Sequence, residues 1–198
     1  MLVFWKARLA LLAVPKTGTQ SYEEMLAPSA DIAIRHPQGM KHMSARKFYK
    51  KFIPLLDPSG AQGIETVAVI RDPLEWLGSW YRYRQRDGIS GSANSTKGIE
   101  FDAFVEAYLS PTRPRFAAVG QQSKFVGGPP ALVTHMFAYE NQAGFRAFLS
   151  DRLGREIAPP PPVNVSPRAK LSLDSGLEAR LRAELAEDFR LHESLQTA

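Results

Sequence analysis

Short apolar runs alternate with longer amphipathic segments along this chain, and the alternation predicts an α/β fold. The runs with the length and apolar character of buried strands are Leu9–Val14, Asp31–Arg35, Thr66–Ile70 and Leu132–Tyr139. Helical periodicity falls between and after them, over residues 19–26, 42–56, 73–86, 101–109, 141–153 and 174–195. Strands that alternate with helices favour a central, mainly parallel sheet with helices on both faces.

The first residues resemble a signal peptide only loosely. The segment Met1–Val14 is apolar and carries Lys6 and Arg8, but the apolar stretch after Arg8 is short, and Pro15-Lys16 follows in place of a small-x-small cleavage site. A buried strand explains the stretch better. No apolar run approaches the roughly 20 residues of a membrane span, so we expect no membrane span and a cytoplasmic protein.

The length of 198 residues favours one domain over residues 1–198, and a hydrophobic share of 44% supplies enough apolar material for its core. Two segments resist regular structure. Residues 87–98 are rich in Gly, Ser and Asn, which is typical of a flexible surface loop. Residues 158–168 hold the four prolines Pro159 to Pro162, which is typical of a stiff extended connector. The absence of cysteine excludes disulfides, thiolate metal sites and thiol catalysis.

The positive charge is concentrated in the first half of the chain. Residues 1–90 carry 13 Lys and Arg against 8 Asp and Glu, whereas residues 91–198 carry 12 of each kind. A basic half suggests an anionic partner such as a nucleotide, a nucleic acid or an acidic glycan. A solvated basic surface is the alternative, and it is the favoured interpretation of the dense run over residues 41–51.

The sharpest motif follows the strand Leu9–Val14. The motif reads Val14-Pro15-Lys16-Thr17-Gly18-Thr19-Gln20-Ser21. A glycine between a strand and a helix lets backbone N–H groups turn toward an anion, and the helix start adds unpaired donors and a positive dipole end. The segment therefore predicts a phosphate or sulfate cradle, with an ordinary strand–helix turn capped by Thr as the alternative. A nucleoside-triphosphate loop of the G-x-x-x-x-G-K-[ST] type is absent, because none of the 14 glycines precedes a lysine.

A second motif follows the strand Thr66–Ile70. Arg71 leaves the carboxyl end of that strand, where open α/β sheets bind ligands, and its guanidinium can hold a phosphate with two hydrogen bonds. Asp72 and Pro73 are the expected cap and first residue of a helix. Ser79 lies eight residues after Arg71, about two helical turns along, and offers one hydroxyl. A structural cap with an ion pair is the alternative interpretation of Arg71-Asp72.

Together, the two motifs resemble those of sulfotransferases that use 3′-phosphoadenosine 5′-phosphosulfate (PAPS), in particular a small bacterial, carbohydrate-sulfotransferase-like branch. The resemblance implies a P-loop-like three-layer sandwich. It also implies that the loop Lys16–Ser21 holds the 5′-phosphosulfate and that Arg71 and Ser79 hold the 3′-phosphate. Weaker matches are the strand ending in Tyr139-Glu140 and the segment Asn164–Arg168, which resembles a loop closing over the nucleotide and adds Arg168 to the donor site.

The resemblance implies sulfuryl transfer from PAPS to a hydroxyl or amine of a small-molecule or glycan acceptor, with release of adenosine 3′,5′-bisphosphate (PAP). Catalysis of such a transfer rests on positioning, charge stabilisation and removal of the acceptor proton. Lys16 is the expected stabiliser of the leaving phosphate, and no metal is expected. The rival hypotheses are an atypical P-loop-like small-molecule kinase and a non-catalytic protein that binds an anion, a nucleotide or a nucleic acid; a nucleic-acid partner is not expected.

The proton acceptor is predicted to be a histidine. His42 follows the second predicted strand and is expected to begin the helix 42–56, where the helix start and Lys41 would disfavour the imidazolium and keep the ring neutral. His36, directly after the strand, is the rival. Glu23 and Glu24 are further candidates, although carboxylates there are expected to serve the dipole of their helix.

Overall fold

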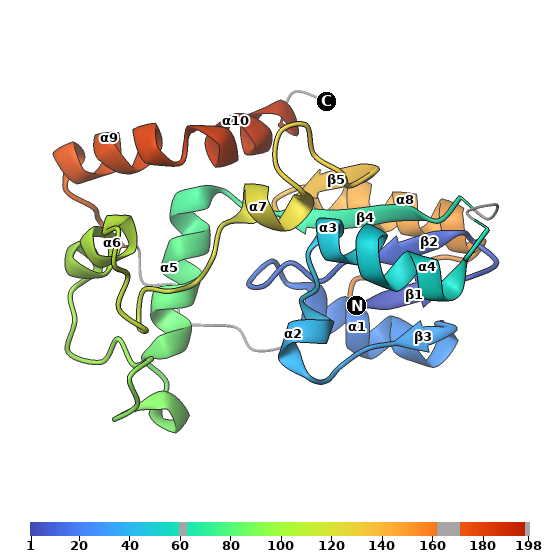
Figure 1. Cartoon of the computed structure of the whole chain (residues 1–198), viewed down its shortest axis with the longest axis horizontal. Helices are drawn as coiled ribbons and strands as arrows, with labels where there is room; N and C mark the ends of the chain where they lie inside the picture. Colours follow the sequence, from blue (N-terminus) through green and yellow to red (C-terminus); the bar gives the residue numbers. More distant parts are fainter. Residues whose placement is uncertain (60–62, 162–170, 197–198) are drawn as a thin grey trace.

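The computed structural model describes residues 1–59, 63–161 and 171–196, and it is built on a five-stranded sheet with the order β3-β1-β2-β4-β5 (Figure 1). The strands are β1 (Leu2–Phe4), β2 (Leu9–Leu11), β3 (Ile32–Ala33), β4 (Glu65–Ile70) and β5 (His135–Ala138). Parallel pairing joins β2 to β4 and β4 to β5, whereas β1 is antiparallel to both β2 and β3. Four strands therefore run in one direction and only β1 opposes them, so the predicted α/β class is confirmed and its sheet is mixed.

Some helices match the predicted segments closely, whereas others start later than predicted or are interrupted. They are α1 (Thr19–Leu26), α2 (Gln38–Lys41), α3 (Ala45–Lys47) continued by a π-helical turn (Phe48–Phe52) and α4 (Ile53–Leu56), α5 (Pro73–Arg84), α6 (Phe101–Leu109), α7 (Gln122–Val126), α8 (Gln142–Leu153), α9 (Ser175–Glu184) and α10 (Ala186–Ser194). The helix expected over 42–56 begins at Ala45, because Ser44 is extended. The helix expected over 174–195 breaks at Leu185, and β1, α2 and α7 were not predicted.

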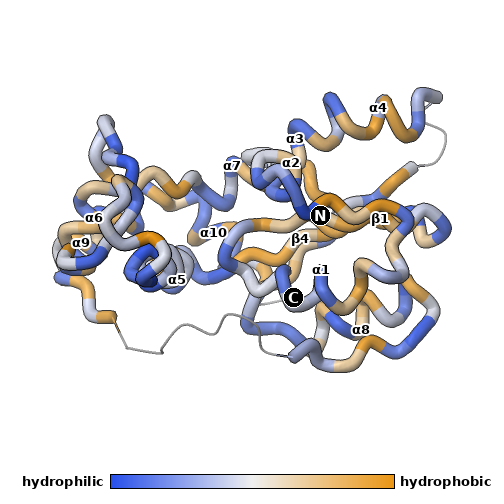
Figure 2. The backbone as a smooth tube through the Cα atoms, turned by 90° about the horizontal axis from the view of Figure 1, so that it is seen from below, coloured by the Kyte–Doolittle hydropathy of each residue, from blue (hydrophilic) through white to orange (hydrophobic). Residues whose placement is uncertain are grey.

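Both faces of the sheet carry apolar side chains, in the two-residue alternation of extended chain. On one face, Leu9, Leu11 and Val67 join a buried cluster with Tyr22 and Leu26 of α1 and with Phe145 and Leu149 of α8. On the other face, Ala10, Leu12 and Ala68 join a cluster with residues of α3 and α7, to which α10 adds Leu191 and Leu195. Figure 2 shows the apolar strands β1 and β4 running through the centre of this part of the molecule.

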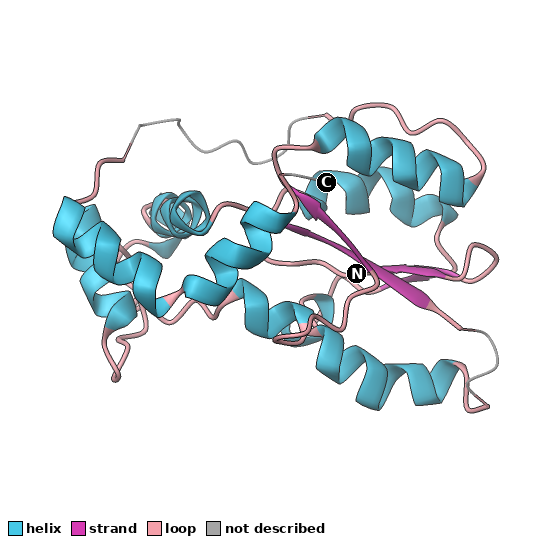
Figure 3. Ribbon diagram, turned by 90° about the horizontal axis from the view of Figure 1, so that it is seen from above, coloured by secondary structure: helices cyan, strands magenta, loops and turns pink. Residues whose placement is uncertain are grey.

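A separate helical cluster stands beyond the carboxyl end of β4. Helix α5 leaves β4 directly and packs with α6 and α9 around Tyr81, Phe104, Tyr108 and Leu181. Figures 1 and 3 show these helices at one end of the sheet, away from its two covered faces. The candidate site therefore lies where the sheet meets this cluster. Residues 87–98 form a 3₁₀ turn (Asp87–Ile89) and loop at the end of α5.

Some predictions fall on residues 162–170, which lie outside the described residues; these include Arg168 and most of the segment 158–168. None of the helices in the described ranges is long and apolar enough to span a membrane.

Candidate functional site

The loop between β2 and α1 is held by its own side chains. Lys16 and Gly18 both adopt left-handed conformations, with φ of 66° and 72°, and left-handed residues in a turn direct successive N–H groups toward one side. The hydroxyls of Thr17 and Thr19 donate to the carbonyl of Val14, at 2.9 and 3.4 Å. Both hydroxyl protons are thus used within the loop. The backbone N–H groups at the start of α1 are left for an anion, because no side chain caps them, and Lys16 adds a positive charge.

Gly18 lies against the ring of Tyr139, the residue that follows β5. A Cβ atom at position 18 would approach Cε2 of Tyr139 to 3.0 Å. The close approach links the loop to the end of a second strand, so the floor of the site is formed by two strand ends together.

We expect Gly18→Ala to weaken anion binding as well as the fold. The left-handed backbone costs an L-residue about 1–2 kcal/mol, and the added methyl displaces Tyr139 or the loop. Gly154→Ala is the matched control, because Gly154 has a φ of 64° and open space at its Cβ position. Thermal melts should fall for both variants, whereas calorimetric affinity for PAP should fall only for Gly18→Ala. Equal PAP affinity in the two variants would show that the loop geometry is not used for binding.

Arg71 occupies the predicted place at the end of β4. Its guanidinium stacks over the ring of Tyr139, with Cζ 4.6 Å from the ring centroid, and one terminal nitrogen lies 3.1 Å from the carboxylate of Glu75. Its Nε is buried and has no hydrogen-bond partner. The side chain as a whole is 17% exposed, so part of it is open to a bound anion.

Helix α5 presents the other predicted phosphate ligand on the same side. Asp72 caps the helix, accepting from the N–H of Glu75 at 2.9 Å. Glu75, Ser79 and Arg82 follow at helical spacings of four and three residues, so they share one face. Glu75 also pairs with Arg82 at 3.7 Å. Ser79 is therefore on the face of α5 that meets Arg71, as the spacing predicts.

The ammonium of Lys16 rests on aromatic rings of α5. It lies 4.1 Å from the ring centroid of Tyr83 and 5.8 Å from that of Trp80. Burial, followed by the charges of Arg86, Arg71 and Arg82, lowers the pKa of Lys16 to about 8. Four cations therefore gather here, and a bound anion would relieve their mutual repulsion.

His42 does not begin a helix as predicted, but its hydrogen bond sets the tautomer that a proton acceptor needs. It follows the end of α2 rather than beginning a helix, so the predicted helix-start effect on its charge is absent. Its Nδ1 lies 2.8 Å from the carbonyl oxygen of Ala13, which precedes the loop. A carbonyl only accepts, so Nδ1 carries the proton and the neutral ring has its lone pair on Nε2. Burial first, and the charge of Lys41 to a smaller extent, lower the pKa of His42.

The rival proton acceptors are less well placed. His36 is exposed, and Glu24 is exposed and bonded to Gln20. Glu23 is buried and forms ion pairs with Lys41, at 2.9 Å, and with the amino group of Met1. Its carboxylate is thus engaged in ion pairs away from any acceptor.

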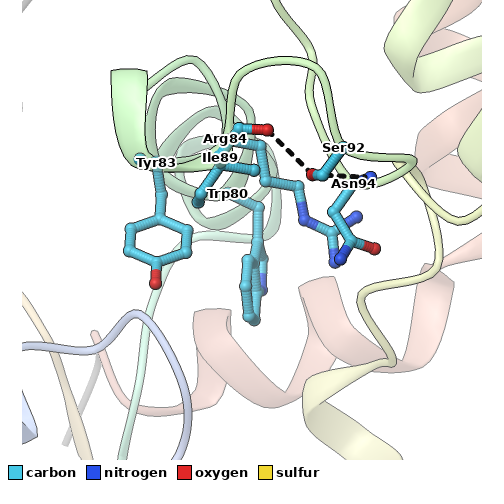
Figure 4. A pocket seen from close by; sticks show the side chains of 7 residues that line it. Trp80, Tyr83, Arg84, Ile89, Ser92 and Asn94 are labelled. Atoms are coloured by element: carbon cyan, nitrogen blue, oxygen red, sulfur yellow. Dashed lines mark hydrogen bonds between the residues drawn. The ribbon is translucent and has the colours of Figure 1, made fainter.

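Two cavities border the site. One of about 320 Å³ lies beside Trp80 and Tyr83, the rings that carry Lys16, and is also lined by Ser92 and Asn94 of the loop 87–98 (Figure 4). The indole Nε1 of Trp80 is buried without a partner. The other, of about 240 Å³, is lined by Pro15, Trp76 and Ser44, the last of which lies two residues after His42. Both cavities are therefore lined by residues that lie close in the chain or in space to the loop.

The structure brings Lys16, Arg71 and the face of Ser79 together, while His42 approaches the loop from the α2 side. The support of Lys16 by Tyr83 and the contacts of Gln122 described below were not predicted; the aromatic spacing along α5 is the one signal in the sequence for the first of them. Within the described ranges, no group of three or more His, Asp or Glu side chains could hold a metal ion. Comparisons with protein-family models, curated proteins and solved structures gave no match.

Proposed function

We propose that this protein is a PAPS-dependent sulfotransferase, which transfers the sulfuryl group to a hydroxyl or amine of a small-molecule or glycan acceptor and releases PAP. The observation that carries the proposal is the convergence of Lys16 and Arg71. Two loops that end parallel strands bring these cations into mutual repulsion, which a bound anion would relieve. A donor with two separate phosphate groups would place one group beside each cation. The sheet with helices packed on its two faces fits the P-loop-like three-layer sandwich of such enzymes.

The residues have distinct roles in this proposal. The N–H groups over residues 17–21 and Lys16 hold the 5′-phosphosulfate, and Arg71 with Ser79 holds the 3′-phosphate. Arg168 belongs to the same proposed donor site. Lys16 stabilises the charge that develops on the leaving phosphate oxygen.

In the transfer step, the acceptor oxygen or nitrogen forms a bond to sulfur while the bond from sulfur to the bridging phosphate oxygen breaks. The electron pair of the broken bond stays on the 5′-phosphate of PAP. The acceptor proton passes to Nε2 of His42, whose Nδ1–H stays bonded to Ala13. The transfer step needs no reactant besides the donor PAPS and the acceptor.

An atypical kinase and a non-catalytic anion-binding protein are the alternatives. A kinase has to shield a triphosphate, commonly with a magnesium ion held by carboxylates, and the carboxylate nearest the cations is Glu75, which pairs with Arg71 and Arg82. A binding protein would use the same cations but would not need the Nδ1-protonated His42. The donor site favours a nucleotide with a separate 3′-phosphate over ATP.

A thermal-shift comparison tests the proposal. We expect PAP to raise the melting temperature without added metal and to do so more than AMP, which lacks the 3′-phosphate, because Arg71 then has a partner. ATP with magnesium and a single-stranded oligonucleotide should shift the melt less. A larger shift with ATP and magnesium would favour the kinase, and a larger shift with the oligonucleotide would favour a nucleic-acid-binding protein.

A further inference from the structure

We infer that Gln122 and Asp188 are positioning residues that fix the backbone of Arg71 and thereby aim its guanidinium at the 3′-phosphate of the nucleotide. The inference rests on the proposed function for the identity of the ligand. Its own evidence is a chain of hydrogen bonds that runs from α10 through α7 to the end of β4.

Arg71 stands just outside the sheet. The pairing of β4 with β5 ends at Ile70 opposite Ala138, and the carbonyl of Ile70 accepts from the N–H of Tyr139 at 2.6 Å. Beyond that point no neighbouring strand pairs with the chain. The direction in which the Arg71 side chain leaves the backbone must therefore be set by another contact.

The side chain of Gln122 supplies that contact. Its Oε1 accepts from the N–H of Arg71 at 2.9 Å, and its Nε2 donates to the carbonyl of Arg71 at 2.7 Å. One planar amide thus pairs with both backbone groups of a single residue, as a neighbouring strand would do. Gln122 is 2% exposed, so water does not compete for these bonds.

Asp188 of α10 holds Gln122 in place. Its carboxylate accepts from the N–H groups of Gln122 and Ser123 at 3.0 and 3.2 Å, and from the side chains of Ser123 and Gln121, both at 2.7 Å. These four donors satisfy a carboxylate that is 3% exposed. They also fix the start of α7, a five-residue helix too short to be stable alone.

The contacts that hold the backbone of Arg71 are different from those that its guanidinium makes. The side-chain hydrogen bonds of Gln122 go to the backbone of Arg71, and that leaves the guanidinium available to stack on Tyr139 and to pair with Glu75. Loss of the clamp would not remove the cation from the site. It would instead leave Tyr139 and Glu75 to order the cation, so more of the entropy of ordering it would be paid on binding.

The test compares PAP with AMP by calorimetry in four proteins: the parent, Gln122→Met, Arg71→Ala and the double variant. Methionine has a similar length and no amide, so it removes both clamp bonds. We expect Gln122→Met to lose about tenfold in PAP affinity and to keep its AMP affinity. Once Arg71 is alanine, the same change should have no further effect on PAP affinity, because two residues acting through one contact are not additive.

Two further variants separate positioning from loss of stability. Ser150 of the distant helix α8 accepts from the N–H of Ile157, so Ser150→Ala should lower the melting temperature and keep the parent's preference for PAP over AMP. Asp188→Asn should act in the same direction as Gln122→Met, and its melting curve shows whether it folds. A parent that binds PAP and AMP equally overturns the proposed function and, with it, the inference. If the parent prefers PAP, two results overturn the inference alone. In the first, Gln122→Met keeps the full preference for PAP. In the second, Gln122→Met lowers PAP affinity by the same factor whether residue 71 is arginine or alanine.

Discussion

Replacing Lys16 with methionine should stabilise the free protein and abolish tight binding of PAP. The pKa of Lys16 falls from 10.5 to about 8 in the fold, which means that the folded state disfavours the charged ammonium. A shift of that size means that the charged ammonium lowers the free energy of unfolding by roughly 3 kcal/mol at most. Methionine would remove this penalty but would also lose the cation–π contact with Tyr83, which contributes about 1 kcal/mol. We expect a rise in melting temperature of roughly 2–8 °C, because methionine keeps the apolar contact with the rings.

The same substitution would remove the proposed charge-assisted contact to the nucleotide. Such contacts contribute about 1.5–3 kcal/mol, so PAP affinity should fall by about 10- to 100-fold in calorimetry. Lys47→Met is the matched control, since Lys47 is exposed and lies outside the proposed donor site. A Lys16→Met protein that melts lower than the parent and binds PAP equally well would show that Lys16 supports the fold and not the ligand.

The low pKa of Lys16 also predicts how pH acts on the parent protein. An anion binds the protonated ammonium, so PAP affinity should be level from pH 7 to about 8 and fall above it as free Lys16 loses its charge. Stability of the free protein has the opposite slope. The cost of the charged ammonium is present in full below pH 8 and disappears as pH rises from about 8 toward 10.5. Both slopes should be absent in Lys16→Met, which calorimetry and thermal melts from pH 7 to 9.5 can measure.

Local chemistry explains why the sequence predicted the turns that carry Gly18 and Arg71. Asp72 followed by Pro73 marks a helix start wherever it occurs after a strand, and the Asp72 cap forms as expected. Gly18 marks a turn that needs a left-handed residue, and it has a φ of 72°. The spacing from Arg71 to Ser79 is fixed once the helix begins, so no tertiary information is needed.

Tertiary contacts explain what the sequence did not predict. Strand β1 is only three residues long and pairs with β2 through a tight turn in which Arg8 is left-handed. The turn contains Lys6 and Arg8 and has no Gly or Pro, so the hydropathy pattern does not mark it as a turn. Helix α7 depends on Asp188, 65 to 66 residues later in the chain. His42 is placed by a carbonyl of Ala13, and no local pattern encodes that contact. The position of His42 and the support of Arg71 therefore depend on contacts between distant segments, which periodicity does not reveal.

The largest expected effect on turnover belongs to His42. His42→Ala should lower the rate of sulfuryl transfer by roughly 10²–10⁴, the usual contribution of a general base, and leave PAP affinity nearly unchanged, because Lys16 and Arg71 hold the donor. The hydrogen bond to Ala13 fixes the proton on Nδ1 and leaves Nε2 for the acceptor proton. His36→Ala is the control and should have little effect, since that ring is exposed.

The pH dependence of the rate and the tautomer of the imidazole ring provide two tests of the proposed role of His42. Burial and Lys41 lower its pKa below the usual 6.5, so the rate should rise with pH through a value below 6.5 and be level by pH 7. Conversion of PAPS to PAP, with water or a trial hydroxyl compound as acceptor, gives the rate. Nitrogen NMR of the histidine rings should show an Nδ1-protonated tautomer that titrates at low pH and disappears in His42→Ala. If His36→Ala stops the transfer and His42→Ala does not, the base is His36. If neither variant slows it, the proton leaves by another route, and only the donor half of the proposed mechanism stands.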